Sequence, residues 1–126
     1  MIARLRQPAD ADARKRDIAA RLADARARTY ALLAPLSDVD MVKQHNPLMS
    51  PPGWDLAHIG NFEELWLVQT LGELPPIDPA YDDMYDAFKH PRRERDQLPI
   101  LDRDQAEEYL GLVRSLALKH LREADL

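Results

Sequence analysis

The sequence predicts an all-α protein built as an up-down helical bundle with three main helices. Apolar residues recur at spacings of three and four in the segments 10–35, 51–71 and 103–123. That spacing places them on one face of an α-helix, and no segment shows the alternation typical of a strand. Five prolines between residues 73 and 103 exclude a long regular element there. We therefore expect a bundle with a long Pro-rich loop before its last helix.

The composition and charge of the chain exclude several classes of protein. The 126 residues suffice for one domain or for part of one, and the net charge of −5 divides into +4 for residues 1–35 and −9 for the remainder. An acidic body lacks the basic surface that nucleic acids require, so no nucleic-acid partner is expected. The absence of cysteine excludes disulfides and thiolate ligands and fits a cytoplasmic protein. The first ten residues lack the apolar core of a signal peptide, and no apolar run of about 18 residues predicts a membrane span.

The first helix is expected over residues 10–35, with arginines on its outer side. Pro35 and Ser37-Asp38 should end it, and a connector containing Pro47 should follow from Met41 to Met49. Its inner face is predicted to consist of Ile18, Leu22, Ala25, Thr29, Leu32 and Leu33.

The second helix is expected over residues 51–71. Ser50 is a favoured N-cap residue, and Pro51 suits the first helical position because its missing N–H would be unpaired there. Gly72 is expected to stop the helix. Glu63 and Glu64 lie in its middle, about 100° apart around the axis, so at most one can face a site as a ligand or base. For at least one of them, solvent or an ion pair with the first helix is the favoured alternative.

His58 is the candidate metal ligand on this helix. Trp54 lies one turn before it and Phe62 one turn after. A neutral imidazole between apolar groups suits a first-row metal, with Asp55 or Asn61 orienting the second ring nitrogen. The alternative is a core histidine that hydrogen-bonds a neighbour. No histidine or glutamate stands at ligand spacing from it, since the others lie on different elements (His45, His90, His120).

The loop before the last helix carries candidate substrate-binding residues. Arg92 and Arg95, behind Pro91, can share one face and bind a carboxylate through paired hydrogen bonds. The alternative is surface ion pairing with neighbouring acidic residues, namely Glu94, Asp96 or Asp102. The aromatic residues Tyr81, Tyr85 and Phe88 are expected to anchor the loop, or else to form a pocket wall, and residues 79–87 to form a short helical turn.

The third helix is expected over residues 103–123, capped by Asp102 or Asp104. Its apolar arc is wide enough to receive another helix, from the same chain or from a partner. The arc is predicted to contain Tyr109, Leu112, Val113, Leu116, Leu118 and Leu121.

Several dispersed motifs carry a resemblance to a known family. They span residues Gln44–Pro51, Trp54–Asn61, Glu63–Leu67, Tyr85–Arg92 and Leu98–Pro99. In these motifs the chain resembles the N-terminal part of EgtB-like enzymes, the iron-dependent sulfoxide synthases of ergothioneine biosynthesis. The resemblance covers most of residues 26–123.

This resemblance implies a DinB-like helical domain, joined in the family to a C-terminal domain like the formylglycine-generating enzyme. Iron(II) is held there by three histidines, of which His58 matches one, while an HxxxH pair on the bundle's last helix supplies the others. Dioxygen is used to join a thiol, γ-glutamylcysteine or cysteine, to trimethylhistidine. Arg92 and Arg95 match the arginines that bind the thiol's carboxylates.

The resemblance also implies what residues 1–126 lack. They form a partial DinB-like domain, without a fourth helix, the HxxxH pair, the C-terminal domain or the catalytic residues, so the fragment alone is expected to be inactive. The uncovered bundle face predicts self-association. Two other functions remain open: a DinB-like binding or assembly module without metal chemistry, and a stand-alone thiol-dependent transferase that completes a metal site with His120 or a second chain.

Overall fold

Three long helical segments dominate the computed structural model, which describes residues 8–126. They are α1 (Pro8–Leu33), α3 (Pro52–Glu63) continued by the π-helix η1 (Glu64–Thr70), and α5 (Arg103–Glu123). The part of the chain described contains no strand, so the all-α prediction is confirmed. Residues 1–7, which make up most of the segment that lacks the apolar core of a signal peptide, lie outside the described residues.

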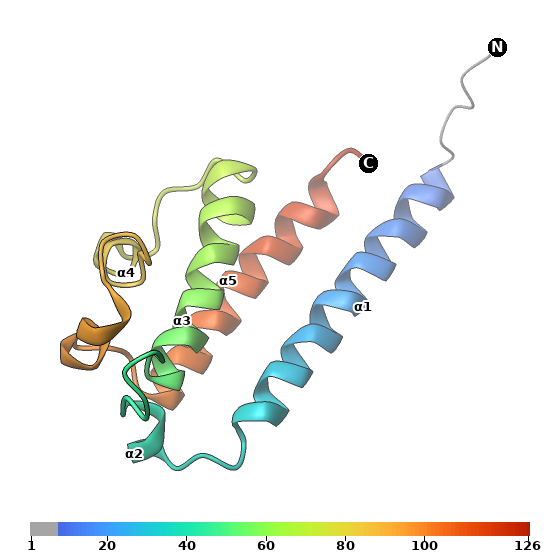
Figure 1. The fold of residues 1–126 in the computed structure, drawn as a ribbon. Helices are drawn as coiled ribbons and strands as arrows, with labels where there is room; N and C mark the ends of the chain where they lie inside the picture. Colours follow the sequence, from blue (N-terminus) through green and yellow to red (C-terminus); the bar gives the residue numbers. More distant parts are fainter. Residues whose placement is uncertain (1–7) are drawn as a thin grey trace.

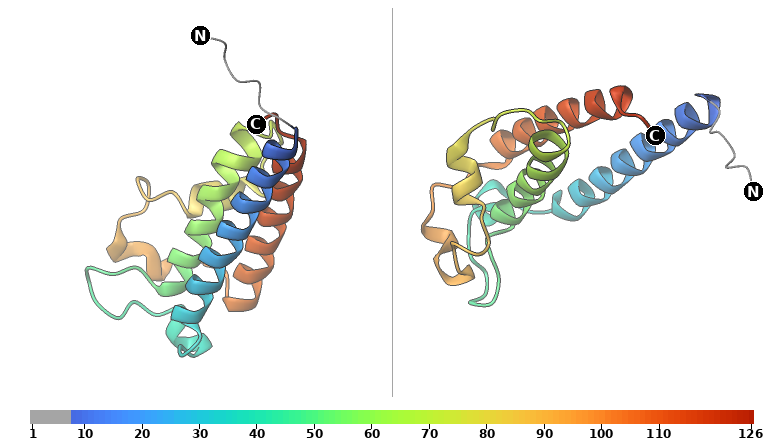
Figure 2. Two further views of the ribbon diagram at one scale, coloured as in Figure 1. Left: turned by 90° about the vertical axis from the view of Figure 1, so that its right-hand side faces the viewer. Right: turned by 90° about the horizontal axis from the view of Figure 1, so that it is seen from above.

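The directions of the helices explain the Pro-rich segment. Helix α1 runs antiparallel to α3, whereas α3 and α5 run side by side in the same direction (Figures 1 and 2). The chain must therefore cross back along the bundle between them. This connection contains two short helices, α4 (Pro79–Met84) and the 3₁₀-helix η2 (Arg92–Gln97). A further short helix, α2 (Asp38–Met41), lies in the connector after α1, where no helix was predicted.

The core lies mainly between α3 and α5. Its buried hydrophobic members are Met41, Trp54, Leu56, Ala57, Val68, Tyr85, Leu101, Ala106, Tyr109, Leu110, Val113 and Ala117. Gly60 permits the close approach of the two helices, because a Cβ at this position would lie 2.8 Å from Leu110 Cγ. The predicted third helix is confirmed from Arg103 to Glu123, and Asp102 and Gln105 form a reciprocal capping box at its start.

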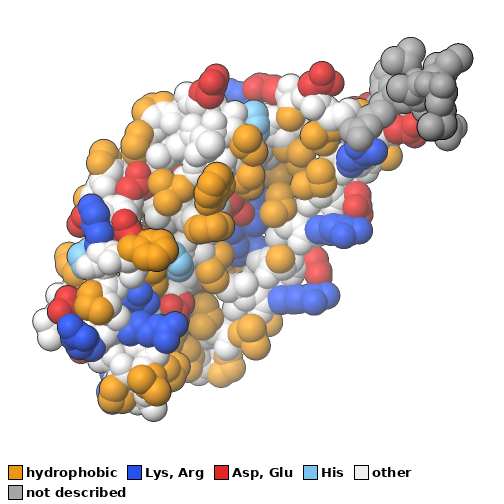
Figure 3. All heavy atoms as spheres, turned by 45° about the horizontal axis from the view of Figure 1, so that its top comes forward, with side chains coloured by type: hydrophobic (Ala, Val, Ile, Leu, Met, Phe, Trp, Pro, Cys, Tyr) orange, Lys and Arg blue, Asp and Glu red, His pale blue; other side chains and the backbone are white. Residues whose placement is uncertain are grey.

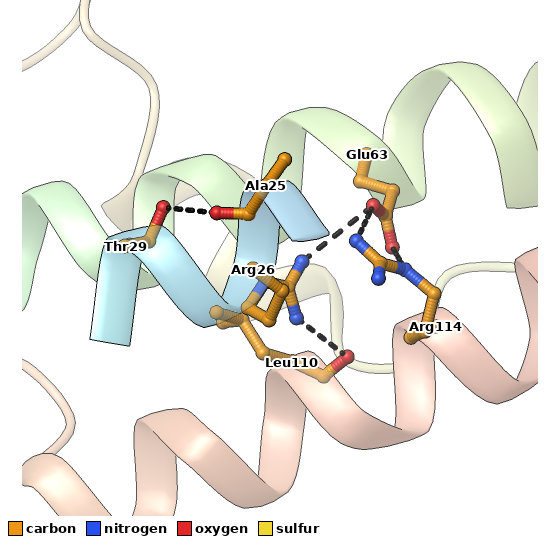
Figure 4. Close-up of polar contacts among 6 residues, drawn as sticks. All are labelled: Ala25, Arg26, Thr29, Glu63, Leu110 and Arg114. Atoms are coloured by element: carbon orange, nitrogen blue, oxygen red, sulfur yellow. Dashed lines mark hydrogen bonds and ion pairs between the residues drawn. The ribbon is translucent and has the colours of Figure 1, made fainter. Parts of the chain in front are cut away.

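Helix α1 is held to the other two by a partly buried cluster of charges (Figure 4). The Glu63 carboxylate accepts hydrogen bonds from Arg114 at 2.9 and 3.2 Å, and Arg26 Nη2 lies 3.5 Å from it. Arg26 also donates to the Leu110 carbonyl. The predicted ion pair between a second-helix glutamate and a first-helix arginine is thus present. Leu32, in contrast, is exposed rather than part of the inner face.

The second helix differs from its prediction at both ends. It begins at Pro52, Pro51 is the N-cap residue, and no side chain caps it. Ser50 is not the cap, because its hydroxyl accepts a charged hydrogen bond from Arg95 instead. At the other end, the residue with left-handed backbone is Glu73, not Gly72. Glycine is required at 72 for space, since a Cβ would lie 2.6 Å from the Val68 carbonyl oxygen.

An apolar groove runs between α1 and the C-terminal halves of η1 and α5. Figure 3 shows hydrophobic side chains gathered in a band beside α1, whose charged side chains point away from the band. The groove encloses about 230 Å³ and is lined by residues that include Ile18, Leu22, Leu67, Leu71, Ala117 and Leu121. None of the described helices combines the length and apolarity needed to cross a membrane.

Candidate functional site

His58 lies on the wall of a cavity of about 510 Å³ between α3–η1 and the crossing segment. The cavity is largely apolar and aromatic, with two carboxylates at its edge. Its lining consists of His58, Asn61, Phe62, Leu65, Trp66, Asp82, Tyr85, Asp86, Ala87 and Phe88. One half-buried imidazole therefore faces a space large enough for a small organic molecule.

Two backbone carbonyls at the end of α4 orient the side chains of α3. His58 Nδ1 lies 2.8 Å from the Tyr85 carbonyl oxygen, and Trp54 Nε1 donates to the Met84 carbonyl at 3.0 Å. The last carbonyls of a helix have no partner within the helix, so they are available as acceptors. Trp54 and His58 are four residues apart on α3 and can therefore reach successive carbonyls of the same chain segment.

This contact selects the tautomer of His58. A carbonyl oxygen only accepts hydrogen bonds, so Nδ1 must carry the hydrogen and a neutral ring keeps a lone pair on Nε2. Metal-binding histidines usually show this arrangement, in which the second nitrogen donates to a carbonyl or carboxylate. The prediction that Asp55 or Asn61 orients the ring is wrong. Asn61 instead donates to Asp82 at 2.7 Å.

Two planar groups, the His58 imidazole and the Arg95 guanidinium, lie against the Trp54 indole. The imidazole stacks on the indole with 4.8 Å between ring centroids and 18° between planes. The Arg95 guanidinium carbon lies 3.7 Å from the centroid of the same indole. Such a cation above an aromatic ring is attracted by the electron-rich face.

The structure buries Arg95 and leaves Arg92 exposed, although both belong to η2. Arg95 donates to Ser50 Oγ at 2.7 Å, to the His90 carbonyl at 2.9 Å and to the Ala87 carbonyl at 3.4 Å. Burial lowers the pKa of Arg95, and the nearby charge of Asp55 opposes that effect. Neither arginine forms the predicted alternative, a surface ion pair, within the described part of the chain.

Arg92 belongs to a second, smaller cavity. This cavity encloses about 250 Å³ and is lined by Leu48, Met49, Ser50, Asp55 and Arg92. The Arg92 guanidinium donates to the Leu48 carbonyl at 3.3 Å, which holds it at the rim. Partial burial raises the pKa of Asp55, while a hydrogen bond with Ser50 and the charge of Arg95 oppose that rise. Asp55 lies one turn before His58 on α3, so each cavity is lined by one of two neighbouring residues of this helix.

Behind the larger cavity lies a buried polar network that the sequence did not reveal. Glu64 is completely buried and accepts hydrogen bonds from Tyr109, Gln69 and the backbone N–H of Ile77. Gln69 also donates to Asp82, whose carboxylate reaches the cavity edge. The π-helix offered no sequence signal, because hydrophobic spacing does not distinguish it from an α-helix. Such helical irregularities frequently occur at functional sites.

The remaining histidines lie elsewhere. His45 contacts the Asp40 carbonyl at 2.8 Å, His90 lies 3.7 Å from Asp83, and His120 lines the groove beside α1. The structure therefore does not bring His120 and His58 into one cavity. Among residues 8–126 as described, no group of three or more histidine, aspartate or glutamate side chains could hold a metal ion.

Of the aromatic residues in the loop, some anchor it to the core and Phe88 lies at the wall of the larger cavity, the two roles that the sequence predicts. Tyr85 is fully buried, and its hydroxyl accepts a hydrogen bond from the Leu101 N–H at 3.0 Å, so it anchors the loop. Tyr81 packs edge-on against Tyr109. Phe88 is fully exposed at the cavity mouth and is not an anchor, because the turn after Asp86 directs it away from the core.

Comparison with known proteins places the chain in a family. A family model described as DinB superfamily matches residues 21–126. The hercynine oxygenases of Mycolicibacterium thermoresistibile and Mycobacterium tuberculosis are 45% and 46% identical to the chain over 83% and 82% of its length. That of Mycolicibacterium smegmatis is 45% identical over 82%. The chain spans about a quarter of the length of these curated relatives. Since the family model matches most of its residues, the chain belongs to the DinB superfamily.

Proposed function

We propose that this chain supplies His58 as one iron ligand of a nonheme iron(II), dioxygen-dependent sulfoxide synthase of ergothioneine biosynthesis. The enzyme would join a thiol to hercynine, which is trimethylhistidine. The observation that carries the proposal is the contact between His58 Nδ1 and the Tyr85 carbonyl at 2.8 Å. It leaves Nε2 of the imidazole available at a cavity wall, which supports the role of a ligand, and the similar hercynine oxygenases support the substrate class.

The donor chemistry at His58 fits iron(II). Neutral imidazole is a suitable ligand for this metal, and a fixed second nitrogen reduces the freedom lost on binding. Iron bound there would supply the redox chemistry with dioxygen. A single imidazole cannot retain the ion, so we propose that two further histidines of the longer parent protein complete the site. The residues of this chain orient the imidazole and shield one of its faces with Trp54.

We propose that Arg92 and Arg95 bind the carboxylates of the thiol substrate, γ-glutamylcysteine or cysteine. Arg92 supports this role best, because its guanidinium is exposed at the rim of the smaller cavity. The wall of that cavity includes Asp55, one turn before His58, so a thiol held there by its carboxylate would lie near the imidazole. Arg95 uses three of its nitrogens for protein contacts, so its part in binding is confined to the N–H groups that remain.

The proposal is tested in the parent protein by His58→Ala, with His120→Ala as the matched control. We expect His58→Ala to abolish stoichiometric iron and sulfoxide formation, and His120→Ala to preserve both. Unchanged iron content and activity in His58→Ala would instead identify an assembly module without metal chemistry. Loss of iron only in His120→Ala would favour the thiol-dependent transferase.

Self-association through the apolar groove stays a prediction. The groove side chains of α1 and α5 are partly exposed, and burying them would be favourable. We expect this 126-residue chain to sediment as a dimer, and Leu22→Glu to return it to a monomer. A monomer at all concentrations would contradict this prediction without affecting the assignment of His58.

A further inference from the structure

The Trp54 indole connects two groups that come from distant parts of the chain. The indole stacks on His58 of the same helix, and the Arg95 guanidinium of η2 lies over the same ring. We propose that Arg95 is a positioning residue for His58 and that it acts through the Trp54 indole. The functional role of Arg95 rests on the proposed function of His58. Its effect on the orientation of the imidazole does not, because all the residues concerned belong to this chain.

The guanidinium is held over the indole from three directions. It donates to Ser50 Oγ just before α3 and to the carbonyls of His90 and Ala87 on the crossing segment. These acceptors leave the planar group little freedom to move, and Arg95 is only 6% exposed. A buried guanidinium above an indole is attracted more strongly than an exposed one, because water does not screen the pair.

The indole is in turn the neighbour that restrains the imidazole. Its N–H donates to the Met84 carbonyl, and the next carbonyl along the chain accepts from His58 Nδ1. A displacement of the indole would remove the flat surface on which the imidazole rests and allow its ring to rotate away from Tyr85. Arg95 therefore stabilises the tautomer that leaves Nε2 free, although it does not contact His58.

The arrangement also links the two cavities. Arg95 shares Ser50 with the wall of the smaller cavity, whereas His58 belongs to the larger one. A carboxylate bound near Arg92 would attract the Arg95 guanidinium. A shift of that guanidinium would move the stacked indole, and with it the imidazole of His58. Arg95 would then couple occupation of the thiol site to the orientation of the metal ligand.

The test uses three variants of the metal-free chain at a pH at which the imidazole is neutral. Arg95→Met keeps the aliphatic stem without the charge, Arg95→Lys keeps a cation, and Arg93→Met is an exposed neighbour that serves as control. Long-range proton–nitrogen NMR reports the ratio of the Nδ1–H to the Nε2–H tautomer of His58. Hydrogen exchange of the Trp54 indole N–H reports the Met84 contact.

We expect Arg95→Met to lower the tautomer ratio about fivefold, the effect of losing one hydrogen bond, and to accelerate indole exchange. Arg95→Lys should recover most of the ratio, because it restores a cation above the ring. Arg93→Met should match the wild type. A merely structural role would lower the melting temperature of both Arg95 variants equally and leave the tautomer ratio unchanged, and this result would overturn the proposal.

Should Arg95→Met fail to fold, Arg95→Lys and Ser50→Ala decide the question. The proposal requires Ser50→Ala, which removes the 2.7 Å hydrogen bond but retains the cation, to reduce the ratio less than twofold. It also requires Arg95→Lys to stay close to wild type. A larger loss in Ser50→Ala than in Arg95→Lys would show that the loop contacts, not the cation, position His58. Because no metal is present, failure of the iron assignment would leave this result unaffected.

Discussion

The Tyr109 hydroxyl donates to the completely buried carboxylate of Glu64 at a distance of 2.5 Å, joining α5 to η1. Two further donors, Gln69 Nε2 and the Ile77 N–H, complete the surroundings of this carboxylate. A buried polar group is tolerated only when its hydrogen-bonding capacity is met, so all three contacts are needed.

Tyr109→Phe should therefore destabilise the chain. It removes a donor from the buried Glu64 while preserving the ring, and we expect a loss of about 1–3 kcal/mol in the free energy of unfolding. Urea unfolding followed by circular dichroism measures this loss. Tyr30→Phe, at a partly buried tyrosine on α1, is the control and should change little. Equal losses of unfolding free energy in the two variants would show that the hydrogen bond to Glu64 does not stabilise the chain.

Alkaline pH should weaken the fold through the buried tyrosines. Burial raises the pKa of Tyr85 to about 12, and burial with the Glu64 hydrogen bond raises the pKa of Tyr109 as well. Tyrosines of the unfolded chain titrate at about 10, so above that pH the unfolded state loses protons that the folded state keeps. The contribution of these tyrosines to stability is therefore complete below about pH 10 and falls as the pH rises toward about 12.

Spectroscopic titration of tyrosinate in the native chain checks this expectation, together with urea unfolding across the same pH range. Two of the four tyrosines should resist ionisation until the protein unfolds. In Tyr85→Phe the pH dependence should become shallower. Titration of all four as exposed groups would contradict the prediction.

Glu63→Gln should loosen α1. The Glu63 side chain is 10% exposed and those of Arg26 and Arg114 are 11% and 16% exposed, so removing the carboxylate leaves two poorly hydrated cations without their partner. We expect a loss of about 2–4 kcal/mol in the free energy of unfolding. Native-state hydrogen exchange should show the increase in opening mainly in α1.

Asp17→Asn provides the matched comparison for Glu63→Gln. It breaks the ion pair of Asp17 with Arg21, whose side chains are 60% and 80% exposed. Exposed pairs of this kind contribute little, so stability should be unchanged. An equal effect of the two substitutions would mean that the Glu63 cluster behaves as a surface pair.

Two glycine substitutions should change the stability of the chain in opposite directions. Gly111→Ala places its methyl group in open space within α5, and we expect about 0.5–1 kcal/mol of added stability from the better helix former. Gly60→Ala would force its methyl group against the buried side chain of Leu110 and separate α3 from α5, which should destabilise the chain by about 1–3 kcal/mol. Melting temperatures measured side by side test the difference in sign.

Local sequence was sufficient for the main helices. The predicted third helix agrees with α5, since the capping box and the spacing of Tyr109 and Val113 are properties of consecutive residues. The second helix lies close to its predicted range, but its ends are capped differently from the prediction. Ser50 has the chemistry of a cap, yet Arg95 takes its hydroxyl, and this partner is 45 residues away.

The sequence by itself determined that the chain is helical, which faces of its helices are apolar, and that His58 is the candidate ligand. The tertiary structure decided which atoms surround that ligand: the Tyr85 carbonyl on Nδ1, the Trp54 indole beneath the ring, and Arg95 over the indole. The physical reason is the range of the interactions. Helix formation depends on neighbours up to four residues apart, whereas these contacts arise only when the crossing segment between η1 and α5 folds back against α3.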